Sequence, residues 1–455
     1  MPFWLPVAAM TIAYKLTRHE RLDAVLAIGQ SGPVTVEHFL RDAAALSPLL
    51  PPRRYVVNLC SDRYRFTVAL AAALMRDQLT LMPPSDMAGV LDGLAAEFDG
   101  LYSIHDGAAP TAAMPALSYP DALPAGPSPA AMPSFPGERP AVVLFTSGST
   151  GRPTPHLKTW GSLVRSSLAA GAALGVARIP AAAIIGTVPQ QHSYGLESTV
   201  MLALQHGLVL HHGRPFYPAD VAACIDATPA PRILVTTPIH LRAMLAASGL
   251  SPALALIVSA TAPLTPQLAS EAELRFGAPL REIYGSSESG QLAVRRTAES
   301  DEWRCLDGVA LHQDAAGSWA SGASVEGRVL LNDIIELQDA TRFRLHGRAA
   351  DLVNIAGKRT SLAHLNYHLN SIPGVRDGVF IMPEESATAT TRLIALVVAP
   401  KLTAEAILAA LRLRIDPAFL PRPLRLVDQL PRNTIGKLPR EAVAQLAGHD
   451  GRSAR

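Results

Sequence analysis

The sequence has few of the residues that mark secreted, membrane-spanning or nucleic-acid-binding proteins. It contains 3 cysteines among 455 residues, Cys60, Cys224 and Cys305, and their spacing matches no metal-binding motif. Such scattered thiols fit a reducing compartment better than secretion. No uncharged apolar run reaches the roughly 18 residues that a membrane span requires. The apolar amino terminus, MPFWLPVAAM, has no basic residue ahead of its apolar run and makes a poor signal peptide. We expect a soluble, cytoplasmic protein without a membrane span.

Charge is scarce as well, and its two signs nearly cancel. Only 17% of the residues are charged and the formal net charge is +2. Bulk electrostatics therefore favours neither nucleic acid nor an acidic surface as a partner. Hydrophobic residues, in contrast, make up 49% of the chain. A chain of this length and composition can bury a large core and is too long for a single typical domain, so we expect two domains.

Strand and helix patterns alternate through most of the chain. Residues 54–83 contain an apolar run, an Ala/Leu-rich helix pattern and a second apolar run, which predicts a βαβ unit. The other strand-like runs are 141–145, 183–188, 233–236 and 255–259, and the helix patterns among them include 238–247 and 265–276. This alternation predicts a large α/β domain with largely parallel strands.

Two segments depart from that alternation. Residues 107–140 are broken by many prolines, and we expect them to form a surface excursion. In the tail, short strand patterns at 377–382 and 393–398 flank a helix pattern at 403–415. The sequence therefore predicts a small α+β domain after the large one. The predicted division is into residues 1–346 and 347–455.

The strand pattern at 141–145 leads into a loop rich in glycine and hydroxyl side chains. Its residues are Thr146, Ser147, Gly148, Ser149, Thr150 and Gly151. Backbone N–H groups and side-chain hydroxyls in such a loop can bind phosphate oxygens without a cation. The lysine that ends a Walker phosphate loop is missing, and loops of this composition are often only turns. The function of the loop must therefore be inferred from the motifs that follow it.

Further motifs stand downstream of the loop. They are Tyr284-Gly285-Ser286-Ser287-Glu288, a lone Asp333, Gly347-Arg348-Ala349-Ala350-Asp351, and Pro431-Arg432-Asn433-Thr434-Ile435-Gly436-Lys437. In this order and spacing, they resemble the signature set of the adenylate-forming superfamily. That superfamily contains acyl- and aryl-CoA synthetases, luciferases and the adenylation domains of peptide synthetases. The resemblance covers most of the chain, from about residue 54 to residue 445.

The resemblance implies a reaction, its cofactors and two catalytic residues. Members of the superfamily use ATP and Mg²⁺ to convert a carboxylic acid into an acyl-adenylate and pyrophosphate, and then pass the acyl group to a thiol. Attack of a carboxylate on the α-phosphate brings two anions together, so the site needs a cation and a metal. Lys437 matches the catalytic lysine of the family, whose ammonium would stabilise the developing charge. Glu288 matches the carboxylate that holds Mg²⁺.

The same resemblance implies a nucleotide site. The loop at 146–151 would bind the β- and γ-phosphates, and Ser287 would contact phosphate beside Glu288. Tyr284 would stack on adenine, Gly285 would let the backbone approach it closely, and Ser286 belongs to the same ATP-binding segment. Asp333 and Arg348 match the residues that bind the ribose, and a carboxylate suits this role because it can accept both ribose hydroxyls.

An acid pocket is implied by two more segments. Residues 189–195 match the Pro-x-x-His-x-x-Gly loop that lines the acyl pocket of the family, and residues 259–264 resemble its Ser-Gly-Gly-Ala-Pro-Leu turn. Both glycines of that turn are replaced here, by Ala260 and Thr261. The pocket-lining residues that follow from the match are His192, Tyr194, Gly195 and Ala260. We assign no proton transfer to His192.

The chain also departs from the family pattern. Most relatives have a lysine where this chain has Thr154, so a cation over the pyrophosphate is lost, and Lys158 and Arg152 are the nearby candidates to replace it. The hinge position, commonly aspartate, is Ala350. Asn354 stands where some relatives carry a lysine used in thiol transfer.

The segment 153–160, PTPHLKTW, is similar to that of the AMP-ligases of aryl-polyene and xanthomonadin-type pigment clusters. This closer resemblance implies a small aromatic acid such as a hydroxybenzoate as substrate, and the phosphopantetheine thiol of an acyl carrier protein as acceptor. A fatty-acyl or aryl-CoA synthetase that uses free CoA is an alternative. A non-catalytic nucleotide or acid sensor is an alternative of another class, and the missing loop lysine favours it. ATP–pyrophosphate exchange would separate the enzymes from the sensor.

Overall fold

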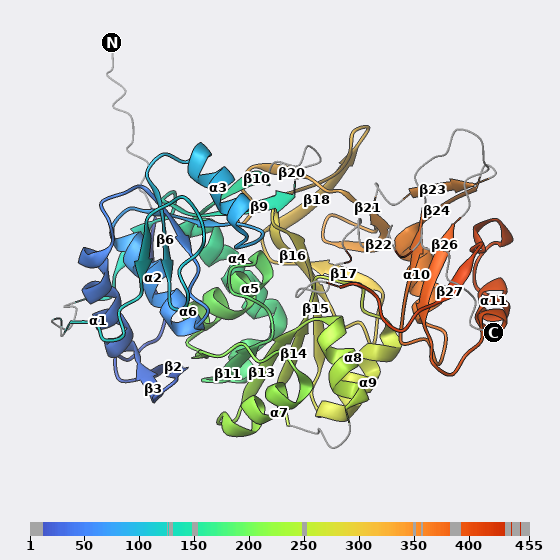
Figure 1. Cartoon of the computed structure of the whole chain (residues 1–455), viewed down its shortest axis with the longest axis horizontal. Coiled ribbons are helices and arrows are strands. Elements are labelled where there is room, and N and C mark those ends of the chain that lie inside the picture. The colour runs from blue at the N-terminus through green and yellow to red at the C-terminus, as the bar shows by residue number, and fades with distance from the viewer. Residues whose placement is uncertain are drawn as a thin grey trace, which may run out of the picture.

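The computed structural model describes residues 12–124, 126, 131–147, 153–247, 253–348, 352–355, 358–382, 393–432, 438 and 446. A large α/β body is followed by a smaller unit of strands and helices at one end of the long axis (Figure 1). This arrangement agrees with the predicted fold class. None of the helices in the described ranges combines the length and the hydrophobicity of a transmembrane segment.

One sheet of the large body is six-stranded, in the order β10-β9-β5-β4-β6-β7. Its strands are β4 (Tyr55–Asn58), β5 (Leu79–Met82), β6 (Leu101–His105), β7 (Ala116–Ser118), β9 (Pro140–Ser147) and β10 (Pro153–Thr159). Helix α2 (Arg63–Met75) joins β4 to its parallel neighbour β5, which confirms the predicted βαβ unit. Asp62 begins α2 by accepting a hydrogen bond from the backbone N–H of Arg65. The other helices of this part are α1 (Val36–Leu46) and α3 (Ala88–Glu97).

The second sheet is eleven-stranded, in the order β21-β22-β17-β16-β15-β14-β13-β11-β12-β2-β3. Its strands are β2 (Val25–Gly29), β3 (Gly32–Thr35), β11 (Ala183–Gly186), β12 (Val209–His211), β13 (Arg232–Thr236), β14 (Leu256–Ser259), β15 (Leu280–Ser286), β16 (Gly290–Arg295), β17 (Glu302–Cys305), β21 (Asp333–Leu337) and β22 (Arg342–Arg348). Strands β15 to β2 are parallel neighbours, and the strands on either side pair antiparallel. The prediction of largely parallel strands is therefore confirmed for the centre of this sheet, where strands such as β11 and β14 are buried along their whole length.

Helices pack on both sheets of the large body. They are α4 (Trp160–Leu174), α5 (Ser193–Gly195), α6 (Leu202–His206), α7 (Pro218–Ala227), α8 (Pro238–Ala246) and α9 (Pro266–Phe276), with a wider helical segment, Leu196–Met201, between α5 and α6. The bounds of α8 and α9 lie within one residue of the predicted 238–247 and 265–276. Proline at the first turn of both helices, and the Thr265 side chain that caps α9, explain why these starts were predictable.

The proline-rich segment 107–140 is more than the predicted surface excursion. Within it β7 pairs with β6 at the edge of the six-stranded sheet, and β8 (Ser134–Pro136) pairs with β1 (Ala13–Lys15). Phe135 is buried and packs edge-on against Trp160, with ring centroids 5.9 Å apart. The prediction was wrong for these parts because proline is tolerated in edge strands, where a missing N–H costs no ladder bond.

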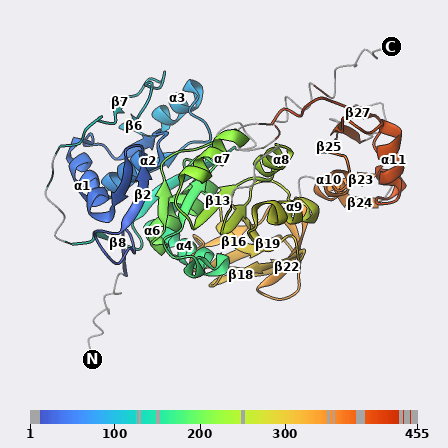
Figure 2. The same cartoon turned by 90° about the horizontal axis from the view of Figure 1, so that it is seen from below.

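The smaller unit has its own strands, helices and apolar core. Its elements are β23 (Leu352–Ile355), β24 (Lys358–Ser361), α10 (Leu362–Asn370), β25 (Asp377–Ile381), β26 (Ile394–Val398), α11 (Ala404–Arg412) and β27 (Leu424–Leu426). Leu365, Phe380 and Ile407 belong to its core. The predicted boundary at residue 347 stays a prediction, and β22 of the large sheet continues to Arg348. Figure 2 shows this unit beside α8 and α9, where Arg242 lies 3.4 Å from Asp377.

A small antiparallel sheet completes the large body next to the eleven-stranded sheet. Its strands are β18 (Val309–Asp314), β19 (Gly317–Gly322) and β20 (Arg328–Leu330).

Candidate active site

Several of the predicted site residues that the structure describes follow the carboxyl ends of parallel strands in the eleven-stranded sheet. Four parallel neighbours, β11, β13, β14 and β15, end at the same edge of this sheet. The predicted acid-pocket loop at 189–195 follows β11, Ala260 follows β14, and Ser286 ends β15. In open α/β sheets ligands bind at the carboxyl ends of the strands. The topology therefore brings the acid-pocket and nucleotide motifs together.

The other sheet contributes the hairpin of β9 and β10. Thr146 lies near the end of β9, and its hydroxyl is 2.9 Å from His156 Nε2 on β10. The same imidazole nitrogen lies 4.0 Å from Glu288 Oε1, and Lys158 Nζ donates a hydrogen bond of 2.7 Å to the backbone carbonyl of Glu288. Thr146, at the start of the predicted phosphate loop, and Glu288, the predicted metal carboxylate, thus both lie near His156.

Part of the phosphate loop lies outside the described residues. Of its predicted residues, Gly148, Ser149, Thr150 and Gly151 are not described, and for Ser147 only the backbone is placed, at the end of β9. The predicted catalytic Lys437 and the candidate cation Arg152 also lie outside the described residues.

Glu288 lies in a tight turn between β15 and β16. The backbone N–H of Ser286 donates to Ser289 Oγ at 3.2 Å, and Ser289 N–H donates to Ser286 Oγ at 3.2 Å. Gly285 is required because a Cβ there would lie 2.2 Å from the carbonyl oxygen of Gly290. Ser287 is partly exposed, and the Glu288 side chain is 27% exposed. The turn therefore presents one accessible carboxylate.

This donor set suits Mg²⁺. Hard carboxylate and hydroxyl oxygens are the donors that Mg²⁺ takes, and it keeps water and substrate phosphates as its other ligands. Within the described ranges, no group of three or more His, Cys, Asp or Glu side chains could hold a metal ion by itself. Glu288 would hold the ion on the protein side, and the ion would offset negative charge on the phosphates of ATP.

Tyr284 connects the predicted adenine and ribose residues. Its hydroxyl donates a 2.8 Å hydrogen bond to Asp333 Oδ2. Its ring is buried against Trp303 and Phe343, with centroids 5.6 and 5.3 Å away. Asp333 begins β21 and is the register partner of Arg348 at the end of β22. Sheet pairing thus places the backbones of the two residues assigned to the ribose opposite each other, and the aromatic cluster fixes Tyr284.

The predicted acid-pocket residues follow the ends of β11 and β14. The Tyr194 hydroxyl hydrogen-bonds to the carbonyl oxygens of Thr236 and Val258 at 3.0 and 2.9 Å. Burial raises the pKa of this hydroxyl well above its ordinary value. His192 Nδ1 accepts a 3.2 Å hydrogen bond from the backbone N–H of Tyr194. The Tyr194 side chain therefore ties the loop to β13 and β14, and its hydroxyl is already engaged by backbone.

Small residues shape the same region. A Cβ at Gly195 would lie 1.9 Å from the carbonyl oxygen of Pro189, so no other residue fits this close approach. Ala260, directly after β14, is buried. The roles of these residues in binding an acid stay predictions.

Thr261 adopts a backbone conformation that suits glycine. Its φ is +77°, in the left-handed region that a β-branched residue rarely enters. The family that this chain resembles has glycine at this position of the turn. Here threonine occupies the position, and the backbone still has a conformation that favours glycine. Strain of this kind costs on the order of 1–3 kcal/mol and concentrates at functional sites.

We expect Thr261→Gly to raise the free energy of unfolding by about 1 kcal/mol, because the relieved strain exceeds the extra freedom of glycine in the unfolded chain. Denaturant unfolding measures the change. Ala181→Gly is the matched control, since Ala181 also has a positive φ, +54°, but is not β-branched, and it should gain less. A Thr261→Gly protein no more stable than the unaltered one would show that the turn carries no strain.

Two buried charged residues near Glu288, Lys158 and Glu197, were not among the predicted site residues. Glu197 was not singled out from the sequence, where it sits in an apolar helical pattern, and Lys158 was only a candidate to replace the loop cation. Lys158 is 3% exposed and Glu197 is 3% exposed. Burial lowers the pKa of the Lys158 ammonium, and the carboxylates of Glu197, Glu326 and Glu288 oppose that shift. A signal existed for Lys158, because residues 154, 156 and 158 alternate onto one face of a strand.

Comparisons with known proteins agree with the fold and the motifs. A family model described as AMP-binding enzyme matches residues 44–318. The chain is 30% identical over 234 residues to a 4-coumarate–CoA ligase of Rhodobacter capsulatus, which covers 51% of this chain and 58% of that relative. It is 29% identical over 312 residues to a 4-coumarate–CoA ligase of Halorhodospira halophila, covering 65% of this chain and 74% of the relative. These names support the predicted enzyme class, an AMP-forming acid–thiol ligase.

Solved structures show the same fold. ATP-bound MatB from Rhodopseudomonas palustris has a TM-score of 0.78 at 16% identity and covers 95% of this chain and 99% of its own. A benzoate CoA ligase from Burkholderia xenovorans has a TM-score of 0.78 at 18% identity and covers 93% and 97%. Because the family model spans more than half of the chain, the chain belongs to the AMP-binding enzyme family, the adenylate-forming superfamily that the motifs predicted.

Proposed function

We propose that this chain activates a small aromatic carboxylic acid, such as a hydroxybenzoate, with ATP and Mg²⁺, and transfers the acyl group to the phosphopantetheine thiol of an acyl carrier protein. One observation carries the first half of this proposal: the β9–β10 hairpin reaches the Glu288 turn directly after β15, the strand whose Tyr284 hydrogen-bonds to Asp333. A phosphate loop, a metal carboxylate and a nucleoside site are the parts that adenylate formation needs.

The reaction would proceed in two steps, adenylate formation and thioester formation. An oxygen of the substrate carboxylate attacks the α-phosphorus of ATP, and the bond to pyrophosphate breaks. The thiol sulfur then attacks the acyl carbon after losing its proton, and AMP leaves as the acyl–oxygen bond breaks. In the first step Thr146 and the loop would orient the phosphates and Lys437 would offset the developing charge, while Asp333 would hold the ribose.

The aromatic substrate is supported by what the relatives are named for. The sequence relatives include the two 4-coumarate–CoA ligases, an indoleacetate–CoA ligase of Aromatoleum aromaticum and a salicylyl-CoA synthase of a Streptomyces species. Each of these acids carries an aromatic ring.

The carrier protein as acceptor is supported by the segment PTPHLKTW, which resembles that of the pigment-cluster ligases. Free CoA is the second candidate, because the names of the relatives specify CoA. Both acceptors present the same phosphopantetheine thiol, so the chemistry of the second step is shared and only the docking surface differs.

We expect a hydroxylamine-trapping screen to give the highest rate with a hydroxybenzoate, compared with cinnamates and with fatty acids such as octanoate. A buried polar partner for the ring hydroxyl would favour it over benzoate by far more than apolar contact can. Intact-mass measurement of a holo carrier protein, with free CoA in a parallel reaction, then identifies the acceptor.

A preference for octanoate over every aromatic acid would contradict the proposed substrate. Efficient transfer to CoA with none to the carrier protein would contradict the proposed acceptor while leaving adenylate formation intact. A chain that binds ATP but catalyses no acid-dependent ATP–pyrophosphate exchange would instead be the sensor.

A further inference from the structure

Thr154, His156 and Lys158 lie on one face of strand β10. Of these three, only Lys158 is a buried cation. Thr154, where most of the resembling family has lysine, is exposed, and His156 is partly exposed. Lys158 follows on the same face and is 3% exposed. Four residues of strand span about 13 Å. The Lys158 ammonium therefore does not occupy the position of the missing loop lysine and must act at another place.

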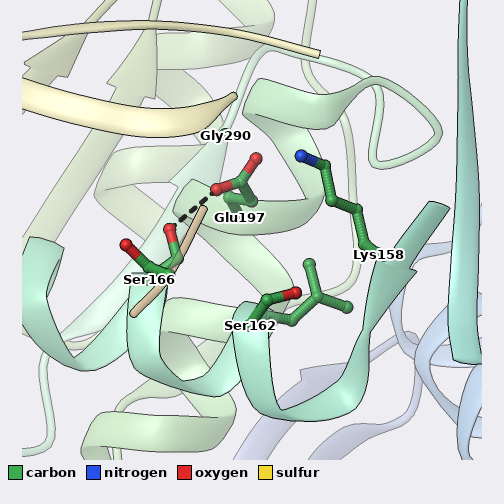
Figure 3. A pocket seen from close by; sticks show the side chains of 7 residues that line it. Lys158, Ser162, Ser166, Glu197 and Gly290 are labelled. Carbon is green, nitrogen blue, oxygen red and sulfur yellow. Dashed lines mark hydrogen bonds between the residues drawn. The ribbon is translucent and has the colours of Figure 1, made fainter. Parts of the chain in front are cut away.

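The Lys158 ammonium instead contacts the backbone of the turn that carries Glu288. Lys158 Nζ donates to the carbonyl oxygen of Glu288 at 2.7 Å. Figure 3 shows the ammonium pointing toward the carboxylate of Glu197, with Gly290 nearby, around a small cavity. Glu197 Oε2 in turn accepts a hydrogen bond of 3.3 Å from the backbone N–H of Gln291. The two buried charges thus contact backbone groups on both sides of the turn.

Glu197 is itself firmly held. Its Oε2 accepts a 3.0 Å hydrogen bond from Ser166 on α4, and its Oε1 accepts a 2.8 Å hydrogen bond from Ser193 on α5. Figure 3 shows the Ser166 contact as a dashed line. Hydrogen bonds from two helices therefore hold the Glu197 carboxylate in place, in addition to its hydrogen bond with Gln291. Lys158 comes from β10 of the other sheet, so its hydrogen bond to the Glu288 carbonyl oxygen joins the two sheets at the site.

The turn that carries Glu288 depends on hydrogen bonds for a fixed conformation, because its side chains offer little apolar packing. Its residues between β15 and β16 are Ser287, Glu288 and Ser289, flanked by Ser286 and Gly290. Short side chains give little apolar contact, and Gly290 has a φ of +75°. Burying an ammonium costs several kcal/mol, and an apolar residue would fill the space without that cost. The buried lysine therefore points to a role in orientation rather than in stability.

We propose that Lys158 is a positioning residue for Glu288, which it orients through the Glu288 backbone carbonyl, with Glu197 as its counter-ion. The inference rests on the proposed role of Glu288 in holding Mg²⁺. A fixed carboxylate would bind the ion of MgATP more tightly, which partly offsets the cation missing at Thr154. Partners that orient a metal ligand in this way typically change metal affinity by about 10- to 100-fold when they are removed.

The test compares Lys158→Met, Lys158→Arg and the double variant Lys158→Met/Thr154→Lys. The first readout is independent of turnover: the rise in melting temperature on binding α,β-methylene-ATP is titrated with Mg²⁺. The second is the Mg²⁺ dependence of acid-dependent ATP–pyrophosphate exchange. We expect Lys158→Met to need about 10- to 100-fold more Mg²⁺ in both titrations. Lys158→Arg, which keeps charge and donors, should restore most of the affinity.

Adding a lysine at position 154 distinguishes positioning from simple charge replacement. If Lys158 acts by holding the turn, Thr154→Lys should not restore the Mg²⁺ titration of Lys158→Met. Lys401→Met, which removes an exposed lysine of the smaller unit, is the control and should titrate like the unaltered protein. If Lys158→Met fails to fold, Lys158→Met/Glu197→Gln removes both buried charges together and takes its place.

An unchanged Mg²⁺ titration in a folded Lys158→Met protein would overturn the proposal, as would full recovery by Thr154→Lys. The unaltered protein tests the proposed function separately. If it shows no Mg²⁺-dependent shift with the ATP analogue, the metal role of Glu288 fails and the positioning role fails with it. A normal shift in the unaltered protein with no change in Lys158→Met rejects the positioning role alone.

Discussion

Replacing Lys437 with alanine should slow adenylate formation at least about 10²-fold, the effect of removing one preorganised group that stabilises transition-state charge. Lys437 ends the motif Pro431–Lys437 and is the cation that the family match assigns to the carboxylate and the α-phosphate. Arg432 in the same motif forms a two-pronged ion pair with Asp377, at 2.7 and 2.8 Å. The chain entering the motif is therefore anchored to the smaller unit. ATP–pyrophosphate exchange measures the first half-reaction.

Thioester formation from a pre-made acyl-adenylate is the internal comparison for Lys437→Ala. This second half-reaction involves no attack on phosphorus, so we expect it to fall far less. Lys401→Ala, in the same unit, should leave both half-reactions unchanged. Equal losses in the two half-reactions of a folded Lys437→Ala protein would show that the lysine has a different role.

The elements that could be predicted from the sequence are those with local signals. The helices α8 and α9 begin at proline and cap residues, and their apolar spacing is helical, so their bounds were predicted within one residue. The strands β11, β13 and β14 are short apolar runs between turn residues. The motif residues could be placed at the ends of such strands, because phosphate loops and ligand loops follow strand ends in α/β folds.

The contacts that complete the site could not be predicted, because they join distant parts of the chain. Lys158 and Glu288 are 130 positions apart, and Tyr284 and Asp333 are 49 apart. The alternation of residues 154, 156 and 158 places Lys158 on the same strand face as His156, but it does not show that this face is buried at Lys158. Burial depends on how the six-stranded sheet meets the eleven-stranded one, and that is a property of tertiary packing. The pairing of β7 with β6 and of β8 with β1 was missed for the same reason.

Replacing Glu288 with glutamine should raise the Mg²⁺ requirement of adenylate formation by at least as much as Lys158→Met does. Glutamine keeps the shape of the side chain but removes the charge of the one carboxylate in the turn, and Mg²⁺ depends on charged, hard oxygen ligands. Loss of an orienting partner typically costs about 10- to 100-fold in metal affinity, and loss of the ligand charge itself should cost no less. The side chain is 27% exposed, so the melting temperature should change little.

A double variant tests whether Glu288 and Lys158 act on the same metal ion in the way proposed. If Glu288 binds the ion and Lys158 only orients it, the combined variant Glu288→Gln/Lys158→Met should be little worse than Glu288→Gln, because there is no longer a charged ligand to orient. Glu299→Gln, at a glutamate that is 61% exposed, is the control and should titrate like the unaltered protein. An unchanged Mg²⁺ titration in Glu288→Gln would move the metal to another residue. Fully additive losses would instead mean that the two side chains act on MgATP independently, since coupled residues in one site lose their separate effects when both are removed.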